Sequence, residues 1–438
     1  MITRNVIIGI DGGCFESILP LIKQNVLPNF KKFFIDGFTA PIQVTVPHAT
    51  IPSWPCLFSG LDVEGLGYYT FIHPIKGIFN SSVWKEKSLF SINDLKVFAL
   101  NVPGTYPAWP INGQMITGIL SPSISCYPKG LEDQIKNKWI IEGKDLPEIL
   151  KAFKMKKKLF LEKMKEDFDL MVYVIRVPDS ISHRVFGDKK IILNAMNLGY
   201  KKIDSFLGEL FRYNQFDNIL ILSDHGLKFY KRVLYFPRLL EKKKLLFLND
   251  LKGKRINNII LKLYDLVRPF LPVYISKRIY QRLFNAEKRE IERKKERRLE
   301  FFDKAQPKTF IQKLTSNMGG LFLFGKDRHK KEVIKKVLKR DRYVDQIFEF
   351  DNPEFPDFLI ALRDDYIFFK DCSYFLTRNT EVFSHTNRGF FMAYGKNIKK
   401  GSMELINYTD VAPIILRLFD KSKPNYMKGK TLNIFKEE

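Results

Sequence analysis

Cysteine is scarce in this chain, and long apolar runs are absent from it. The 438 residues include four cysteines, none of them in a Cys-x-x-Cys pair. This scarcity argues against both a zinc-thiolate site and a disulfide framework. No run of about 18 apolar residues occurs, so a membrane-spanning helix is not expected. The apolar stretch 6–10 is also too short for a secretory signal. We therefore expect a cytoplasmic protein.

Acidic residues are fewer than basic ones in this chain. The chain has 73 lysines and arginines against 48 aspartates and glutamates, a net charge of +25. The excess is densest in residues 241–300, which hold 18 basic and 8 acidic side chains. Such a charge favours anionic partners: phosphorylated substrates, lipid head groups or nucleic acid.

Three apolar, β-branched runs each end in a polar turn that carries an aspartate. Alternation of such strands with helical segments predicts an α/β fold with a mostly parallel central sheet. Because ligands bind beyond the carboxyl ends of the strands in such sheets, the three aspartates should meet at one edge. The runs are 6–10 before Asp11, 170–175 before Asp179, and 218–222 before Asp224.

The predicted core is interrupted once. Residues 239–305 read as basic helical sequence broken by Pro269 and Pro272, and strand-like sequence resumes at 319–324. We interpret residues 1–238 and 306–438 as two parts of one catalytic α/β core. Residues 239–305 are then a basic helical cap inserted between them.

Three of the six histidines lie beside carboxylates or glycine turns, which is typical of a metal site. Asp179 and His183 would share one face of a helix that starts at Pro178. Asp224 and His225 precede a glycine that permits a turn. The alternatives are a helix-capping Asp179 with a surface histidine, ordinary turn aspartates at 11 and 224, and a structural His385.

Thr50 precedes Pro52 and a short apolar run, a pattern that suits the first residue of a helix. The free amides and the dipole at such a position favour an anion. A metal ion that lowers the pKa of the hydroxyl could make it a nucleophile. A plain N-cap threonine is the alternative.

Together these motifs resemble the type I phosphodiesterase/nucleotide pyrophosphatase group of the alkaline phosphatase superfamily. The resemblance covers most of the chain outside the basic insertion. Segments such as 101–107, 118–123 and 408–413 are similar to a less characterised phosphohydrolase/phosphomutase subgroup. The motifs occur in the group's order: Asp11, Thr50 to Trp54, Asp179 with His183, Asp224 with His225, and His385 before 389–395.

The resemblance implies an alkaline phosphatase-like sheet with helices on both faces, and a binuclear site. Thr50 would attack phosphorus and form a phosphothreonine, which a metal-bound hydroxide then hydrolyses. The metals expected from the resemblance are two zinc ions, with manganese and iron as alternatives. Asp11, Thr50, Asp224 and His225 would hold one ion, and Asp179, His183 and His385 the other.

The sequence differs from the group's pattern at several positions, and these differences make some of the superfamily's activities less expected. The loop 65–71 lacks the histidine and asparagine that nucleotide pyrophosphatases place near the phosphate, which weakens the case for nucleotide substrates. The sulfatase motif is absent, and a threonine stands where the mutases have serine. We therefore predict a metal-dependent phosphodiesterase of EC 3.1 type. The alternatives are a phosphomonoesterase or phosphonate hydrolase with the same site, or a non-catalytic basic protein that binds anionic polymers or membrane surfaces.

The expected substrate is a phosphorylated small molecule or a lipid-linked phosphate, and no specific nucleic-acid partner is expected. Apolar residues recur at near-helical spacing among basic ones in 254–300. Such a surface could contact the inner face of an anionic membrane. The alternative is a solvated cap helix whose apolar side packs on the core. The oligomeric state is left open.

The membrane hypothesis predicts tighter binding of the chain to liposomes that contain acidic lipid than to neutral liposomes. Salt should weaken this binding, because it screens the attraction between lysine or arginine and the head groups. Cosedimentation at low and high ionic strength measures both effects. Equal binding to the two kinds of liposome, without a salt effect, would rule the contact out.

Overall fold

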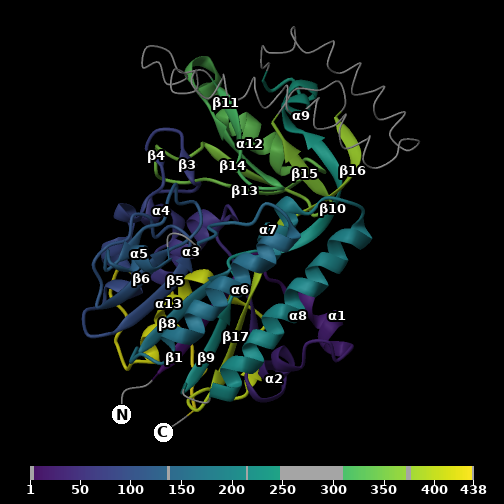
Figure 1. Cartoon of the computed structure of the whole chain (residues 1–438). Helices are drawn as coiled ribbons and strands as arrows, with labels where there is room; N and C mark the ends of the chain where they lie inside the picture. Colours follow the sequence, from purple (N-terminus) through teal and green to yellow (C-terminus); the bar gives the residue numbers. More distant parts are fainter. Residues whose placement is uncertain (1–3, 136–138, 214–215, 247–308, 371–375, 437–438) are drawn as a thin grey trace. The chain divides into compact units, whose positions relative to one another are not determined.

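The computed structural model describes residues 4–135, 139–213, 216–246, 309–370 and 376–436 (Figure 1). Close contacts divide the chain into two compact units. The first consists of Met1–Phe229 with Phe383–Glu438, and the second of Tyr230–Val382. Among the described helices, none has the length and apolar character needed to cross a membrane.

A ten-stranded sheet forms the centre of the first unit. Its middle strand, β1 (Asn5–Ile10), is hydrogen-bonded to two parallel neighbours, β8 (Leu170–Ile175) and β9 (Asn218–Leu222). The main exception to the parallel direction is β17 (Arg388–Gly395), which runs antiparallel to β9 and β2 (Phe38–Gln43). The predicted mostly parallel sheet is confirmed. Nine strands follow the order β18-β2-β17-β9-β1-β8-β5-β6-β7, and the tenth, β19 (Ile406–Asn407), pairs with β2 beside this path. The remaining bounds are β5 at Val97–Val102, β6 at Gly113–Thr117, β7 at Cys126–Tyr127 and β18 at Gly401–Ser402.

Both faces of this sheet are covered, as its fully buried central strands require. On one face, Val6, Ile8 and Ile10 belong to a core that includes side chains of six helices. On the other face, Trp54 of α3 (Thr50–Ser59) packs over β1 at Gly9. Figure 1 shows α6 and α8 running across the first face. The six helices are α1 (Phe15–Lys23), α2 (Pro28–Asp36), α5 (Leu131–Ile135), α6 (Leu146–Lys163), α7 (Val177–Arg184) and α8 (Lys189–Tyr213).

The segment after β1 forms two helices, α1 and α2, and not a single long one. Pro28 has no amide hydrogen and disfavours helical backbone in the residue before it, so a new helix begins there. The first backbone amides of α2 have no carbonyl partner within the helix. Asp204 of α8 supplies one, because its Oδ1 accepts hydrogen bonds from the amides of Asn29 and Phe30, each at 2.9 Å.

The second unit has a sheet of its own. Its four strands, β11 (Phe310–Lys313), β12 (Met318–Phe322), β14 (Phe358–Leu362) and β13 (Val344–Phe348), are antiparallel to their neighbours. Leu321, Phe358 and Phe368 pack there with Ile334 of α12 (Lys331–Lys339) into a separate core.

The observed division therefore differs from the predicted one. The strand expected at 319–324 was assigned to the catalytic core, but it pairs within the second unit because its apolar side chains are buried there. The second unit also begins before residue 239 and ends after residue 305. Of the predicted basic cap, residues 247–305 lie outside the described residues.

The contact between α3 and β1 depends on Gly9. A Cβ atom there would lie 2.5 Å from Cη2 of Trp54 and 2.8 Å from Cγ2 of Val174. We predict that Gly9→Ala lowers the free energy of unfolding by about 1–3 kcal/mol, the usual cost of overpacking a core. Urea denaturation measures the change.

Gly130→Ala is the matched control, because a Cβ atom there meets nothing within 4 Å. Its effect should stay within about 0.5 kcal/mol. If the two variants unfold at the same urea concentration, the close approach of Trp54 to β1 does not limit stability.

Candidate functional site

The predicted aspartates lie at one edge of the central sheet. Asp11 directly follows β1, and Asp224 comes just after β9. Asp179 lies in the first turn of α7 (Val177–Arg184), the helix after β8, as expected from Pro178. Backbone bonds join these strand ends: the amide of Asp11 donates to Ile175 O at 2.9 Å, and that of Asp179 to Asp11 O at 3.2 Å. Because β17 is antiparallel, its beginning, next to His385, lies at the same edge.

Asp11, Asp224 and His225 form one group, and all three are fully buried. His225 Nε2 lies 3.4 Å from Asp11 Oδ1 and 3.4 Å from Asp224 Oδ2. The other oxygen of Asp224, Oδ1, accepts the amide of Gly12 at 3.2 Å. These contacts fix the side chains around a common point.

Asp179, His183 and His385 form a second group. Asp179 Oδ1 lies 3.3 Å from His183 Nε2 and 3.0 Å from His385 Nε2. The two histidine Nε2 atoms are 3.1 Å apart. The helix-face arrangement of Asp179 and His183 is therefore confirmed, and the structure brings His385 to both.

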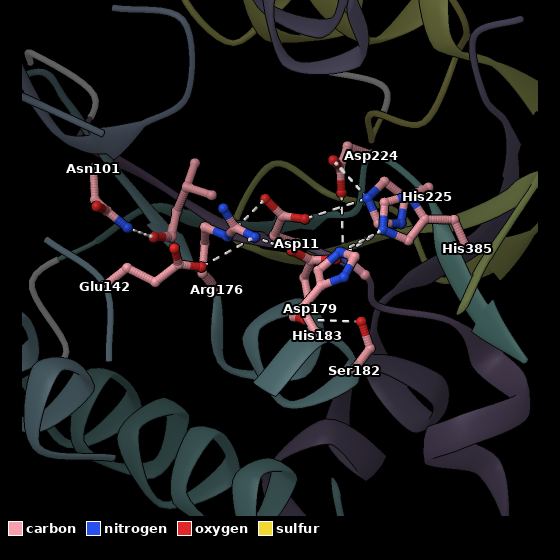
Figure 2. Close-up of polar contacts among 12 residues, drawn as sticks. Asp11, Asn101, Glu142, Arg176, Asp179, Ser182, His183, Asp224, His225 and His385 are labelled. Carbon is pink, nitrogen blue, oxygen red and sulfur yellow. Dashed lines mark hydrogen bonds and ion pairs between the residues drawn. The ribbon is translucent and has the colours of Figure 1, made fainter. Parts of the chain in front are cut away.

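The two groups touch through His225 and His385. Their rings stack with centroids 3.9 Å apart and planes inclined by 18° (Figure 2). His225 immediately precedes β10 (Gly226–Tyr235), and His385 lies near the end of β16 (Thr377–Thr386). Strands β10 and β16 are neighbours in a three-stranded sheet. In the chain, β10 follows β9 and β16 precedes β17, so each histidine lies where the chain passes between a strand of that sheet and a strand of the central sheet.

Burial and charge act in opposite directions on the aspartates. Burial alone would raise the pKa of Asp11, but the charge of Arg176 and contacts with His225 lower it to about 2. The pKa of Asp224 rises to about 7, because burial and the charge of Asp11 both disfavour its ionised form. Close carboxylates at this edge thus repel one another unless a cation lies between them.

The histidines of the second group favour the neutral form. Partial burial lowers the pKa of His183, whose side chain is 48% exposed, and nearby Arg176 adds to the effect. Burial, followed by the charges of His225 and His183, also holds the pKa of His385 well below its usual value. Neutral imidazole is the form that binds a metal ion.

Several buried polar atoms at this edge have no hydrogen-bond partner. They are Asp11 Oδ1 and Oδ2, Asp224 Oδ2 and His225 Nε2. Buried polar atoms are rarely left without partners in native structures. A divalent cation accepts donation from carboxylate oxygen and imidazole nitrogen together, so these residues fit a metal ion.

Thr50 begins α3 at the same edge. Strand β2, which precedes it, is antiparallel to β17 and therefore parallel to β9. The position before α3 is Ala49, and Ile51 is extended at φ −111°, ψ 120°, so Thr50 is not the N-cap residue. Thr45 Oγ1 is hydrogen-bonded to Pro47 O at 2.9 Å and lies 2.5 Å from Ser53 Oγ, which fixes the chain on both sides of Thr50.

Two charged residues of this edge are not among the predicted ones. Arg176 forms ion pairs with Asp11 and Asp179, and Glu142 lies 3.8 Å from Arg176 Nη2. A basic residue directly after a buried strand is the signal that could have indicated Arg176. Nothing in the sequence around Glu142 points to the site.

A family model confirms the resemblance found in the motifs. It describes type I phosphodiesterase/nucleotide pyrophosphatase and matches residues 5–390. The chain belongs to this family. It is accordingly an enzyme, a hydrolase of the phosphodiesterase type. No curated protein matches the chain in sequence.

Solved structures share the fold. Murine ectonucleotide pyrophosphatase/phosphodiesterase 5 superposes with a TM-score of 0.60 at 12% identity. The human protein of the same name gives 0.59 at 14% identity. An inactive threonine-to-alanine variant of the murine protein in complex with AMP gives 0.55 at 15% identity. Each comparison covers 99% of this chain and 100% of the other.

We predict that the purified chain binds two divalent ions per molecule. Asp224→Ala and His385→Ala should each reduce the content toward one, because each removes a side chain from a different group. Atomic emission spectroscopy of the dialysed protein measures the content.

His329→Ala serves as the control for a lost histidine, because His329 is exposed and lies in the second unit. This variant should keep both ions. Unchanged metal content in Asp224→Ala and His385→Ala would exclude the two groups as ligand sets.

Proposed function

We propose that this enzyme hydrolyses a phosphodiester with Thr50 as its nucleophile at a centre of two divalent metal ions, zinc being the ion expected. The observation that carries the proposal is the cluster of unpartnered, buried carboxylate and imidazole atoms. This cluster lies at the sheet edge where α3 begins.

The two groups of side chains divide the ligands. Asp11, Asp224 and His225, together with Thr50, would hold one ion. Asp179, His183 and His385 would hold the other. When bound, the ions neutralise the phosphate, lower the pKa of the hydroxyl and stabilise the attacking and leaving oxygens.

Thr50 supplies the covalent chemistry. Its hydroxyl gives its proton to water, and Oγ1 forms a bond to phosphorus as the bond between phosphorus and one ester oxygen breaks. That oxygen takes a proton from water and leaves as an alcohol. Attack of water on the resulting phosphothreonine releases a phosphate monoester and restores Thr50. The inactive threonine-to-alanine variant of the murine protein supports this role.

Two features bear on the substrate class: the positive charge of the chain, and the absence from loop 65–71 of two residues that nucleotide pyrophosphatases have. The net charge of +25 favours a phosphorylated small molecule or a lipid-linked phosphate. The family's nucleotide substrates are less expected here. In the loop 65–71, which lacks the histidine and asparagine, Tyr68 and Tyr69 are both buried.

We predict that Thr50→Ala reduces kcat on an aryl phosphate diester by about 1,000-fold or more, as loss of a covalent nucleophile does. Thr50→Ser keeps a hydroxyl and should retain part of the activity. Steady-state rates of metal-loaded protein give the comparison, and metal content and thermal unfolding show whether each variant is intact.

Each outcome has a defined meaning. Equal rates of Thr50→Ala and wild type would eliminate Thr50 as the nucleophile. Faster cleavage of an aryl phosphate monoester than of the diester would change the reaction class to phosphomonoesterase and leave the nucleophile in place.

A further inference from the structure

Arg176 lies between the two ligand groups. It is the residue before α7, and its side chain is only 10% exposed. Its Nη2 donates to Asp179 Oδ2, and its Nε lies 3.4 Å from Asp11 Oδ2. One guanidinium group thus contacts one aspartate from each group (Figure 2).

The two oxygens of each aspartate face different neighbours. Both Oδ2 atoms face Arg176. The Oδ1 atoms face the histidine nitrogens: Asp11 Oδ1 lies 3.4 Å from His225 Nε2, and Asp179 Oδ1 lies 3.0 Å from His385 Nε2. In both aspartates, therefore, one oxygen faces the arginine and the other faces a histidine.

We propose that Arg176 is a positioning residue that hydrogen-bonds Asp179 Oδ2 and faces Asp11 Oδ2 with its charge, and so leaves Oδ1 of each carboxylate as the oxygen for a metal ion. This inference rests on the metal centre of the proposed function. It assigns to this chain's own arginine the control of how many oxygen ligands each ion receives.

The consequence is a preference among metals. Carboxylates can bind an ion through one oxygen or through both. Zinc is satisfied by four ligands, whereas manganese and magnesium favour six oxygen ligands. By holding Asp179 Oδ2 in a hydrogen bond and attracting Asp11 Oδ2, Arg176 reduces the number of carboxylate oxygens that turn to the ions and so favours zinc.

Residues behind Arg176 hold it in place. Glu142 Oε1 lies 3.8 Å from Arg176 Nη2, and Glu142 Oε2 accepts Arg184 Nη2 at 2.8 Å. Lys156, which is buried in α6, donates to Ile141 O and to Asn101 Oδ1, both at 2.9 Å. These bonds fix the backbone next to Glu142, so the guanidinium is held from the side away from the cluster.

The sign of the effect on metal affinity tests the proposal. A positioning role predicts that Arg176→Met binds zinc about 10–100-fold more weakly, the usual cost of losing a group that orients metal ligands. If Arg176 acted only as a positive charge that opposes the ions, the same variant would bind zinc more tightly. Titration of metal-free protein against a chromophoric chelator measures the affinity without reference to catalysis.

The visible spectrum of the cobalt-substituted protein gives a second readout. In Arg176→Met the freed Oδ2 atoms can also coordinate the ion, so the geometry should shift from tetrahedral toward octahedral. Octahedral cobalt absorbs more weakly than tetrahedral cobalt. A merely structural role of Arg176 would lower the free energy of unfolding of the metal-free protein and would not change this spectrum.

Two variants complete the design. Arg176→Lys keeps the charge but replaces the rigid guanidinium fork, whose Nε and Nη2 face the two carboxylates separately, with a single ammonium nitrogen. It should therefore also bind zinc more weakly, and it decides the question if Arg176→Met does not fold. Arg184→Met is the matched control, because Arg184 shares Glu142 but forms no described bond with Asp11 or Asp179. It should bind zinc as the wild type does.

The outcomes separate this inference from the proposed function. Wild-type protein that binds no divalent ion would overturn the metal centre itself, and the inference with it. If the wild type binds two ions and Arg176→Met and Arg176→Lys bind them equally well or better, only the role of Arg176 is overturned.

Discussion

Repulsion among buried carboxylates is the constraint on which this site depends. Asp11, Asp179 and Asp224 are almost completely excluded from solvent and all lie close to His225. An uncompensated charge in such a place costs several kcal/mol, roughly as much as a large part of a domain's stability. Arg176 compensates part of the negative charge. The negative charge that Arg176 leaves uncompensated explains why the cluster fits cations. The positions of the side chains reflect both the repulsion among the carboxylates and their attraction to Arg176.

The sheet is what forces the aspartates together. Each follows a strand that is buried on both faces, and adjacent parallel strands end at the same edge. The helices that cover the sheet hold these strand ends in register, and Trp54 does so from the face opposite α6 and α8. The chemistry therefore depends on packing far from the cluster. Strand β17 is antiparallel to β9, so its first residues lie at the edge where β1, β8 and β9 end.

Much of this arrangement could be predicted from the sequence. Apolar runs that end in aspartate identify both a strand and its carboxyl end, so the central sheet and the positions of Asp11, Asp179 and Asp224 followed from local pattern. His385 did not: its neighbours in sequence carry no such pattern, and only the resemblance to a family assigned it. Arg176 and Glu142 were missed because their role comes from contacts between distant segments. The division into units was also predicted differently, since a strand such as β12 has the same local pattern whichever sheet it joins. The assignment of ligands, nucleophile and metals stays a prediction.

The backbone passes from the first unit to the second at two points, and a histidine of the cluster stands beside each. His225 leads into β10, and His385 closes β16. Phe229 of β10 and Phe383 of β16 lie just beyond these histidines, and their ring centroids are 4.6 Å apart. This aromatic pair joins the two strands near the points where the chain passes between the units. It lies wholly within the first unit. A variant that replaces residues 230–382 with a turn therefore keeps it, together with the contact between the two segments that carry His225 and His385.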